Sequence, residues 1–433
     1  KKILLLLLIC FAQNLFAQKT FTYGDFSYTI NENNEITITR YNGYSSSVDI
    51  PSVIDGKIVT TIGEMAFSGC DSLKSITIPN SVTTIEACAF SSCDSLTSVT
   101  IPDSVTTIGE KAFSFCKSLT NIEISENNET FTMVDNILYD KKEKMLHTCF
   151  SKKTNVVIPN GILKINNGAF YYCNSLTSIT IPDSVTTIGD EAFAWCKSLK
   201  SITIPNSVTT IGKEGFFGCK SLTSITIPDS VTTIGDGAFS YCDSLTSIII
   251  SNSVTTIGKY AFFDCDSLTS ITIPKSVTTI GEDAFSDCKS LTSIIIPNSV
   301  KTIGDEAFSY CKSLTSITIP TSVTTIGDGA FKSCESLTSI TIPNSVTTIG
   351  YEAFSYCKSL TSVTIPNSVT TIGDEAFYNC NSLISITIPK SVTTIGERAF
   401  SYCDSLTIQC NSGSYAEKYC KKNNIKYLTP DEL

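Results

Sequence analysis

Cysteine is the residue type whose number and spacing most suggest chemistry in this chain. The sequence has 433 residues and nineteen cysteines, fourteen of which recur in step. Every step is 23 residues except the one from Cys116 to Cys173, which is 57. A line of single cysteines lacks the clustered ligands of a zinc site. We therefore predict no metal and a column of reduced thiols that pack as small apolar side chains. The fourteen are Cys70, Cys93, Cys116, Cys173, Cys196, Cys219, Cys242, Cys265, Cys288, Cys311, Cys334, Cys357, Cys380 and Cys403.

Other catalytic equipment is sparse. His147 is the one histidine, so the many serines and threonines have almost no imidazole base to activate them. Carboxylate pairs such as Asp190-Glu191 and Asp374-Glu375 follow a repeated glycine, and their recurrence indicates a solvated acidic edge. The sequence contains no glycine-rich phosphate-binding motif. We expect no enzymatic activity and no cofactor.

Two cysteines near the end of the chain stand outside the column. Cys410 and Cys420 are ten residues apart, a spacing at which a disulfide could close the C-terminal segment. The alternative is two unrelated free thiols.

The elements that must position all these residues are copies of one unit. Residues 224–246 read S-I-T-I-P-D-S-V-T-T-I-G-D-G-A-F-S-Y-C-D-S-L-T. The Ile-Thr-Ile alternation predicts a half-buried strand, which Pro228 ends because it has no N–H. Asp236 to Phe239 predicts one short helical turn. A single unit cannot cover its own apolar residues, so the copies must stack on one another.

A fixed period of this length around Leu-x-x-Ile-x-Ile is typical of a leucine-rich-repeat solenoid. The unit L-T-S-I-T-I-P-x-S-V-T-T-I-G-x-x-A-F-x-x-C resembles the BspA-like leucine-rich repeat family of bacterial and protist surface proteins. We therefore expect a right-handed coil of 23-residue units with a parallel β-sheet on its concave face. Short turns or single helical turns should complete each unit.

The chain divides into six expected segments. A basic Lys1-Lys2 pair and the apolar run from Ile3 to Phe11 predict a secretory signal peptide over residues 1–17. The other segments are an N-terminal β-hairpin cap (18–60), leucine-rich repeats (61–120), an enlarged repeat with an inserted β-hairpin (121–158), further leucine-rich repeats (159–408) and a C-terminal cap (409–433).

Charge and composition limit the classes of molecule that the protein can bind. A formal net charge of −10 argues against nucleic acid, whose phosphates require a basic surface. After removal of the signal peptide no apolar run remains for membrane insertion, so we expect a secreted or cell-surface protein. The resemblance implies adhesion to host or microbial surface or matrix proteins. A glycan-binding module is the alternative, and ice binding by the regular hydroxyl grid is a third reading.

Two sets of outward side chains are the candidate ligand-binding residues. The first set consists of strand hydroxyls: Ser224, Thr226, Ser270, Thr272, Ser316, Thr318, Thr341 and Thr364. The second consists of rings just before the repeat cysteine: Trp195, Tyr241, Tyr310 and Tyr356. Aromatic rings are favoured anchors at interfaces. The alternatives are soluble strand residues copied by duplication, and rings that cover the adjacent turn.

Overall fold

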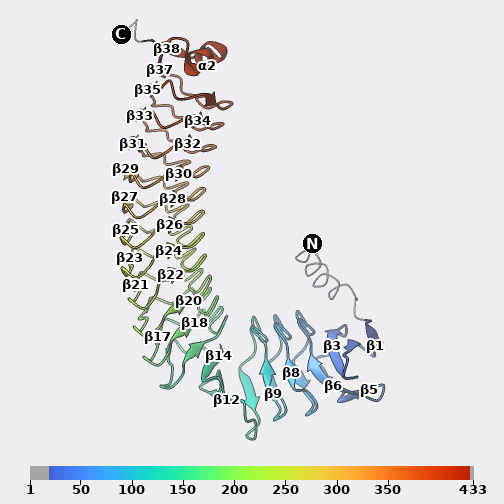
Figure 1. Ribbon diagram of the computed structural model, residues 1–433. Helices are drawn as coiled ribbons and strands as arrows, with labels where there is room; N and C mark the ends of the chain where they lie inside the picture. The colour runs from blue at the N-terminus through green and yellow to red at the C-terminus, as the bar shows by residue number, and fades with distance from the viewer. Residues whose placement is uncertain (1–18, 430–433) are drawn as a thin grey trace, which may run out of the picture. The chain divides into compact units, whose positions relative to one another are not determined.

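The computed structural model describes residues 19–429, and the predicted signal peptide lies outside the described residues. The chain forms two compact units, Lys1–Ser151 and Lys152–Leu433. Within each unit, short strands and turns recur rung after rung to form a β-solenoid (Figure 1). The rungs have the 23-residue period of the sequence.

Three antiparallel strands precede the rungs of the first unit, and a second antiparallel group follows them. Strands β1, β2 and β3 pair with one another, as do β12, β13 and β14. Parallel pairing joins β3-β6-β8-β10 and β4-β7-β9-β11. The strands are β1 (Phe21–Tyr23), β2 (Phe26–Ile30), β3 (Ile36–Tyr41), β4 (Ser47–Asp49), β5 (Val53–Ile54), β6 (Lys57–Ile62), β7 (Ser75–Thr77), β8 (Thr84–Ile85), β9 (Ser98–Ile101), β10 (Thr107–Ile108), β11 (Asn121–Ile124), β12 (Phe131–Val134), β13 (Ile137–Asp140) and β14 (Met145–Cys149).

The second unit carries two ladders of parallel strands, one of which the sequence predicted. The Ser-Ile-Thr ladder comprises β15 (Asn155–Val157), β17 (Ser178–Thr180), β19 (Ser201–Ile202), β21 (Ser224–Thr226), β23 (Ser247–Ile249), β25 (Ser270–Thr272), β27 (Ser293–Ile295), β29 (Ser316–Thr318), β31 (Ser339–Thr341), β33 (Ser362–Thr364), β35 (Ser385–Ile388), β37 (Thr407–Cys410) and β38 (Lys426–Leu428). The Thr-Ile ladder comprises β16 (Lys164–Ile165), β18 (Thr187–Ile188), β20 (Thr210–Ile211), β22 (Thr233–Ile234), β24 (Thr256–Ile257), β26 (Thr279–Ile280), β28 (Thr302–Ile303), β30 (Thr325–Ile326), β32 (Thr348–Ile349), β34 (Thr371–Ile372) and β36 (Thr394–Ile395).

The turn from the repeat glycine to the repeat cysteine forms the third side of each rung, which we call the turn side. The predicted helical turn at Asp236 to Phe239 is wrong, whereas the short turns that the sequence also allowed are present. Gly237 and Tyr241 have φ angles of 61° and 58°, and two left-handed residues in one turn are incompatible with an α-helix. Alternate N–H groups instead bond to carbonyls of the next rung: Gly237 to Lys259 (2.7 Å), Phe239 to Ala261 (2.8 Å) and Tyr241 to Phe263 (2.8 Å).

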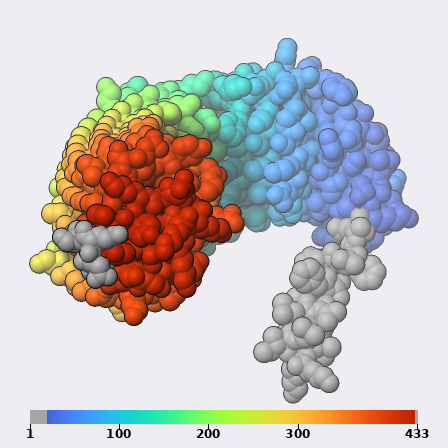
Figure 2. Space-filling model, turned by 90° about the horizontal axis from the view of Figure 1, so that it is seen from above, coloured from blue at the N-terminus to red at the C-terminus, as the bar shows by residue number. Residues whose placement is uncertain are grey.

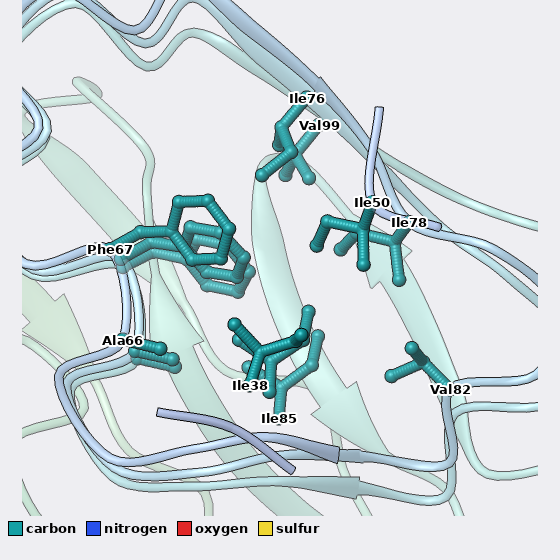
Figure 3. Close-up of a cluster of buried hydrophobic side chains, with 14 of the residues drawn as sticks. Ile38, Ile50, Ala66, Phe67, Ile76, Ile78, Val82, Ile85 and Val99 are labelled. Atoms are coloured by element: carbon teal, nitrogen blue, oxygen red, sulfur yellow. The ribbon is translucent and has the colours of Figure 1, made fainter. Parts of the chain in front are cut away.

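A column of stacked phenylalanines fills the centre of the second unit. Consecutive rings lie 5.0 to 5.5 Å apart, within 12° of parallel, from Phe170 to Phe400. The first unit shows how the sides of a rung contribute: Phe67 enters from the turn side, Ile76 from a Ser-Ile-Thr strand and Ile85 from a Thr-Ile strand (Figure 3). The three sides therefore share one core.

The repeat glycine permits this close stacking. A Cβ atom on Gly281 would lie 2.6 Å from the carbonyl carbon of Gly258 in the preceding rung. Backbone cannot move aside as a flexible side chain can, so a side chain at Gly281 would push this rung away from the preceding one. Glu86 stands at the equivalent position of the first unit, so glycine is needed at Gly281 for the close approach of these two rungs and not for the turn as such.

The C-terminal segment ends the second unit with α2 (Tyr415–Asn423) and β38. Ser414 accepts a hydrogen bond from the Glu417 N–H across 3.2 Å, and Asn424 closes the helix in the left-handed conformation. Strand β38 pairs in parallel with β37. In the view from above, this segment lies over the end of the unit (Figure 2).

Candidate binding surfaces

The repeat cysteines are structural. Eleven of the fourteen are buried, and Cys70, Cys116 and Cys173 are partly exposed. The Cys242 thiol donates to the carbonyl oxygen of Phe216 across 3.3 Å. Burial raises the pKa of Cys242 to about 12, so the thiol stays protonated and weakly nucleophilic at neutral pH. Among residues 19–429 no three His, Cys, Asp or Glu side chains are placed to hold a metal ion.

Cys410 and Cys420 are both buried, on β37 and α2 respectively. Both are free thiols in the structure. Burial raises the pKa of Cys420 to about 12, and the neighbouring Cys410 contributes to that rise. Their disulfide stays a prediction.

His147 has a structural place inside the first unit. Its Nε2 atom lies 2.7 Å from the carbonyl oxygen of Ile108, which can only accept, so Nε2 carries the proton. Its Nδ1 atom then accepts from the Thr148 hydroxyl, 2.8 Å away. Burial lowers the pKa of His147, and the bond to Ile108 opposes that shift. Both ring nitrogens are hydrogen-bonded within the buried interior of the first unit, which fixes the orientation of the ring.

The first carboxylate of each pair at the acidic edge also accepts a hydrogen bond from a backbone N–H of the next rung. Asp190 Oδ1 accepts from the Lys213 N–H and Asp374 Oδ1 from the Glu397 N–H, each across 2.7 Å. These bonds join consecutive rungs. The edge is more than a solvated face, because its aspartates satisfy donors that the turn leaves open.

The predicted strand hydroxyls are all exposed and lie on the Ser-Ile-Thr ladder. Its strands form three sheets, β15-β17-β19, β21-β23 and β25 to β38, and the strands within each sheet are in register. Ser224 pairs with Ser247, and Thr318 with Thr341. Two apolar residues, Ile249 and Ile295, occupy threonine positions and are 66% and 73% exposed. From β21 to β35 the strand residues facing outward carry no charge. This face offers hydroxyls, methyl groups and isolated apolar side chains over several consecutive rungs.

The predicted aromatic residues are more engaged than expected of free anchors. Trp195, Tyr241 and Tyr356 are partly buried, and Tyr310 is exposed. The Trp195 ring contacts the Phe217 ring, with centroids 5.1 Å apart. A Cβ on Gly218 would lie 2.7 Å from Trp195, so the ring covers the backbone of the next rung.

Sequence reasoning missed part of this aromatic column. Phe217, Phe263 and Tyr378 complete it from a position two residues before the repeat cysteine. The signal was present: these rungs carry Gly, Asp or Asn directly before the cysteine, where other rungs carry the ring. A rung can supply the ring from either position, and the rung of Cys173 supplies Tyr171 and Tyr172 from both.

The two candidate sets lie on different sides of the rung. The hydroxyls belong to the Ser-Ile-Thr ladder, whereas the rings belong to the turn side. In the equivalent rungs of the first unit, Phe67 and Ile76 enter the core from different directions (Figure 3). We therefore treat the two sets as separate surfaces.

Comparison with known proteins assigns the chain to a family. The model of the BspA type leucine rich repeat region matches residues 37–140, 163–292 and 279–407, in six copies. The chain belongs to the BspA-type leucine-rich repeat family. The expected family and solenoid fold are thereby confirmed. Among the curated proteins compared, none matches the chain.

The chain is similar to solved structures of bacterial leucine-rich repeat proteins. A leucine-rich repeat protein from Bacteroides ovatus is 28% identical, with 94% of this chain and 99% of that chain covered and a TM-score of 0.58. A leucine rich cell surface protein from Faecalibacterium prausnitzii is 32% identical over 93% of this chain and 97% of that one, with a TM-score of 0.46. Within residues 19–429, no helix combines the length and the apolar character that crossing a membrane requires.

Proposed function

We propose that this BspA-type protein is exported by its signal peptide and acts, secreted or at the cell surface, as a non-enzymatic adhesin. Its ligands would be host or microbial surface or matrix proteins, bound through the Ser-Ile-Thr ladder. The cell-surface description of the Faecalibacterium protein supports the proposed location.

One observation carries the proposed surface. The outward strand residues from β21 to β35 form an uncharged array that contains the exposed Ile249 and Ile295. Removing isolated hydroxyls and apolar side chains from water costs far less than removing charges. A protein ligand can therefore contact many consecutive rungs, and weak contacts on several rungs add through effective concentration.

The test compares two faces of the same rungs. Thr226→Lys, Thr272→Lys and Thr318→Lys together place three charges on the Ser-Ile-Thr ladder. Thr233→Lys, Thr279→Lys and Thr325→Lys place the same charges on exposed threonines of the Thr-Ile ladder, and this second triple variant is the matched control. Binding of the mature chain to immobilised matrix proteins, such as fibronectin and fibrinogen, is measured by surface plasmon resonance.

The first triple variant should bind at least tenfold more weakly than the wild type, whereas the control should bind with wild-type affinity. The melting temperatures of both variants should be unchanged. Equal binding by both variants would show that the Ser-Ile-Thr ladder is not the contact surface. Binding that disappears instead on substitution of the exposed residues of the 121–158 segment would assign the contact to the enlarged repeat.

A further inference from the structure

A groove on the turn side of the second unit lies around Gly237. It has a volume of about 480 Å³ and is lined by four aromatic rings, Phe217, Tyr241, Tyr260 and Phe263, and by Lys213, Glu214, Asp236, Gly237, Ser240 and Lys259. We propose that this groove binds a neutral sugar ring, as a mono- or disaccharide unit of a glycan. The site goes beyond the protein contact proposed for the Ser-Ile-Thr ladder and does not depend on it.

The groove exists because one side chain is missing from a regular column. In the flanking rungs the position of Gly237 is taken by Glu214 and Tyr260. The three backbones are alike, with φ of 61° at Gly237, 54° at Glu214 and 55° at Tyr260. Glycine is therefore not required by the conformation of the turn. Its effect is to leave a gap between two walls.

A second glycine in the same column shows how such a gap is otherwise closed. Gly329 also lies between longer side chains, but Lys332, three residues later, forms an ion pair with Glu352 in the next rung. The residue three after Gly237 is Ser240, which is buried and donates to the Tyr260 carbonyl oxygen across 2.5 Å. Ser240 is too short to take the part that Lys332 plays beside Gly329, and the groove at Gly237 therefore stays open.

The aromatic lining is suited to the apolar face of a sugar. Tyr241 contacts Phe217 and Phe263 edge to face, with centroids 5.1 and 5.4 Å apart, and Tyr260 contacts Phe263 at 6.0 Å. The contacts hold the rings at fixed angles before any ligand arrives, which lowers the entropic cost of binding. Tyr260 is 40% exposed and provides a ring that a sugar can cover with its C–H groups.

The polar lining favours a neutral ligand over a charged one. Two lysines and two carboxylates balance each other around the groove. Lys213 pairs with Glu214 at 3.6 Å, and Lys259 pairs with Glu282 at 2.8 Å. One oxygen of Asp236 accepts the Lys259 N–H across 2.8 Å. Such a rim offers donors and acceptors to hydroxyl groups without a net attraction for ions, and the volume is within the range of about 300–1,000 Å³ usual for small-molecule sites.

The decisive variant is Gly237→Glu, because glutamate occupies the equivalent position of other rungs, for example Glu306 at φ 52°. It fills the groove with a side chain whose backbone conformation the turn already accepts. A Cβ on Gly237 would lie 2.9 Å from Glu214 Cγ, and one on Gly329 would lie 3.0 Å from Glu306 Cγ, so both variants require the same small shift of a flexible side chain. Gly329→Glu makes the same change away from the groove and is the control. Should Gly237→Glu fail to fold, as judged by circular dichroism, Tyr260→Glu removes one wall ring and places glutamate again at a position where neighbouring rungs carry acids.

The mature chain is first applied to an array of neutral glycans and then titrated with maltose, lactose and cellobiose by calorimetry. Trp195 is the one tryptophan of the chain and lies 5.1 Å from the Phe217 ring, so its fluorescence gives a second readout. We expect binding of at least one neutral glycan by the wild type and by Gly329→Glu, with at least a tenfold loss in Gly237→Glu or Tyr260→Glu.

Three results would overturn the proposal. In the first, the wild type binds no neutral glycan. In the second, Gly237→Glu binds the glycan as tightly as the wild type does. In the third, the wild type binds only charged glycans or aromatic peptides. The triple lysine variant of the Ser-Ile-Thr ladder should still bind the sugar, so failure of the adhesin proposal and failure of this one are distinguishable.

Discussion

The thiol of Cys242 donates a hydrogen bond to the carbonyl oxygen of Phe216, one rung earlier in the stack. The donor and the acceptor are 26 residues apart in sequence. The same bond, with the same separation, joins Cys93 to Phe67 and Cys403 to Phe377. Cysteine therefore serves as a donor that links the two innermost columns, as well as a small apolar side chain. Alanine or valine could fill the same space, but neither could make this bond.

Native protein should resist thiol labelling. Burial raises the pKa of Cys242, Cys288 and Cys357 to about 12, so almost no thiolate exists at pH 8. Titration of the mature chain with a thiol reagent at pH 8 should modify only the partly exposed cysteines, such as Cys88, within minutes. Addition of guanidinium chloride should release the others. Near-complete labelling without denaturant would contradict the buried column.

The regular part of the fold was predictable because one unit is copied many times. The half-buried strand predicted for the unit is present in the successive rungs from β7 to β37. The Thr-Ile ladder was not foreseen, because two strand residues such as Thr233 and Ile234 show no alternation to detect. The turn was misread for another reason: Asp236 and Ala238 suit a helix start, whereas the left-handed φ of Tyr241 depends on hydrogen bonds to the next rung.

The candidate sites were less predictable than the fold. Exposure of Thr226 and Thr318 follows from strand alternation, which the sequence shows directly. The groove at Gly237 does not, because a glycine in a turn has many possible causes. Only the position of Ser240 and the rings of the flanking rungs show that the missing side chain leaves a space.

Gly281→Ala should destabilise the second unit by about 1–3 kcal/mol, the usual cost of inserting a methylene into a tightly packed site. Its Cβ would lie 2.6 Å from the Gly258 carbonyl carbon, and backbone atoms cannot rotate away. Chemical denaturation followed by Trp195 fluorescence provides the measurement. Gly329→Asn is the control, since its φ of 60° is tolerated by asparagine. A similar loss in both variants would show that glycine at Gly281 serves flexibility and not close approach.

Acid should loosen the first unit around His147. Burial holds the pKa of His147 below its usual value of 6.5, so below pH 6.5 the unfolded chain takes up a proton that the folded chain does not. The free energy of unfolding therefore falls as the pH drops from 6.5 towards the folded pKa. Hydrogen exchange of Met145–Cys149, corrected for intrinsic rates, should show weaker protection at pH 5 than at pH 7.5. His147→Gln keeps an N–H donor for Ile108 without a titrating ring, so a pH effect of the same size in that variant would exclude the imidazole as its cause.

Trp195 and Gly218 should be energetically coupled. The ring of Trp195 lies over Gly218, where an added Cβ would be 2.7 Å from ring carbon Cε3. Gly218→Ser alone should therefore destabilise the second unit by about 1–3 kcal/mol through overpacking. Combined with Trp195→Ser it should cost much less, because the ring that it would strike is absent.

The four proteins of this double-mutant cycle are compared by urea denaturation followed by circular dichroism, since two of them lack tryptophan. Serine at the equivalent position Ser333 has φ of 57°, close to the 67° of Gly218, so the backbone conformation itself permits the change. A coupling energy of at least about 1 kcal/mol is expected for residues in direct contact. Strict additivity would mean that Trp195 moves freely out of the way, and the ring would then be an available ligand anchor instead of a cover for the turn.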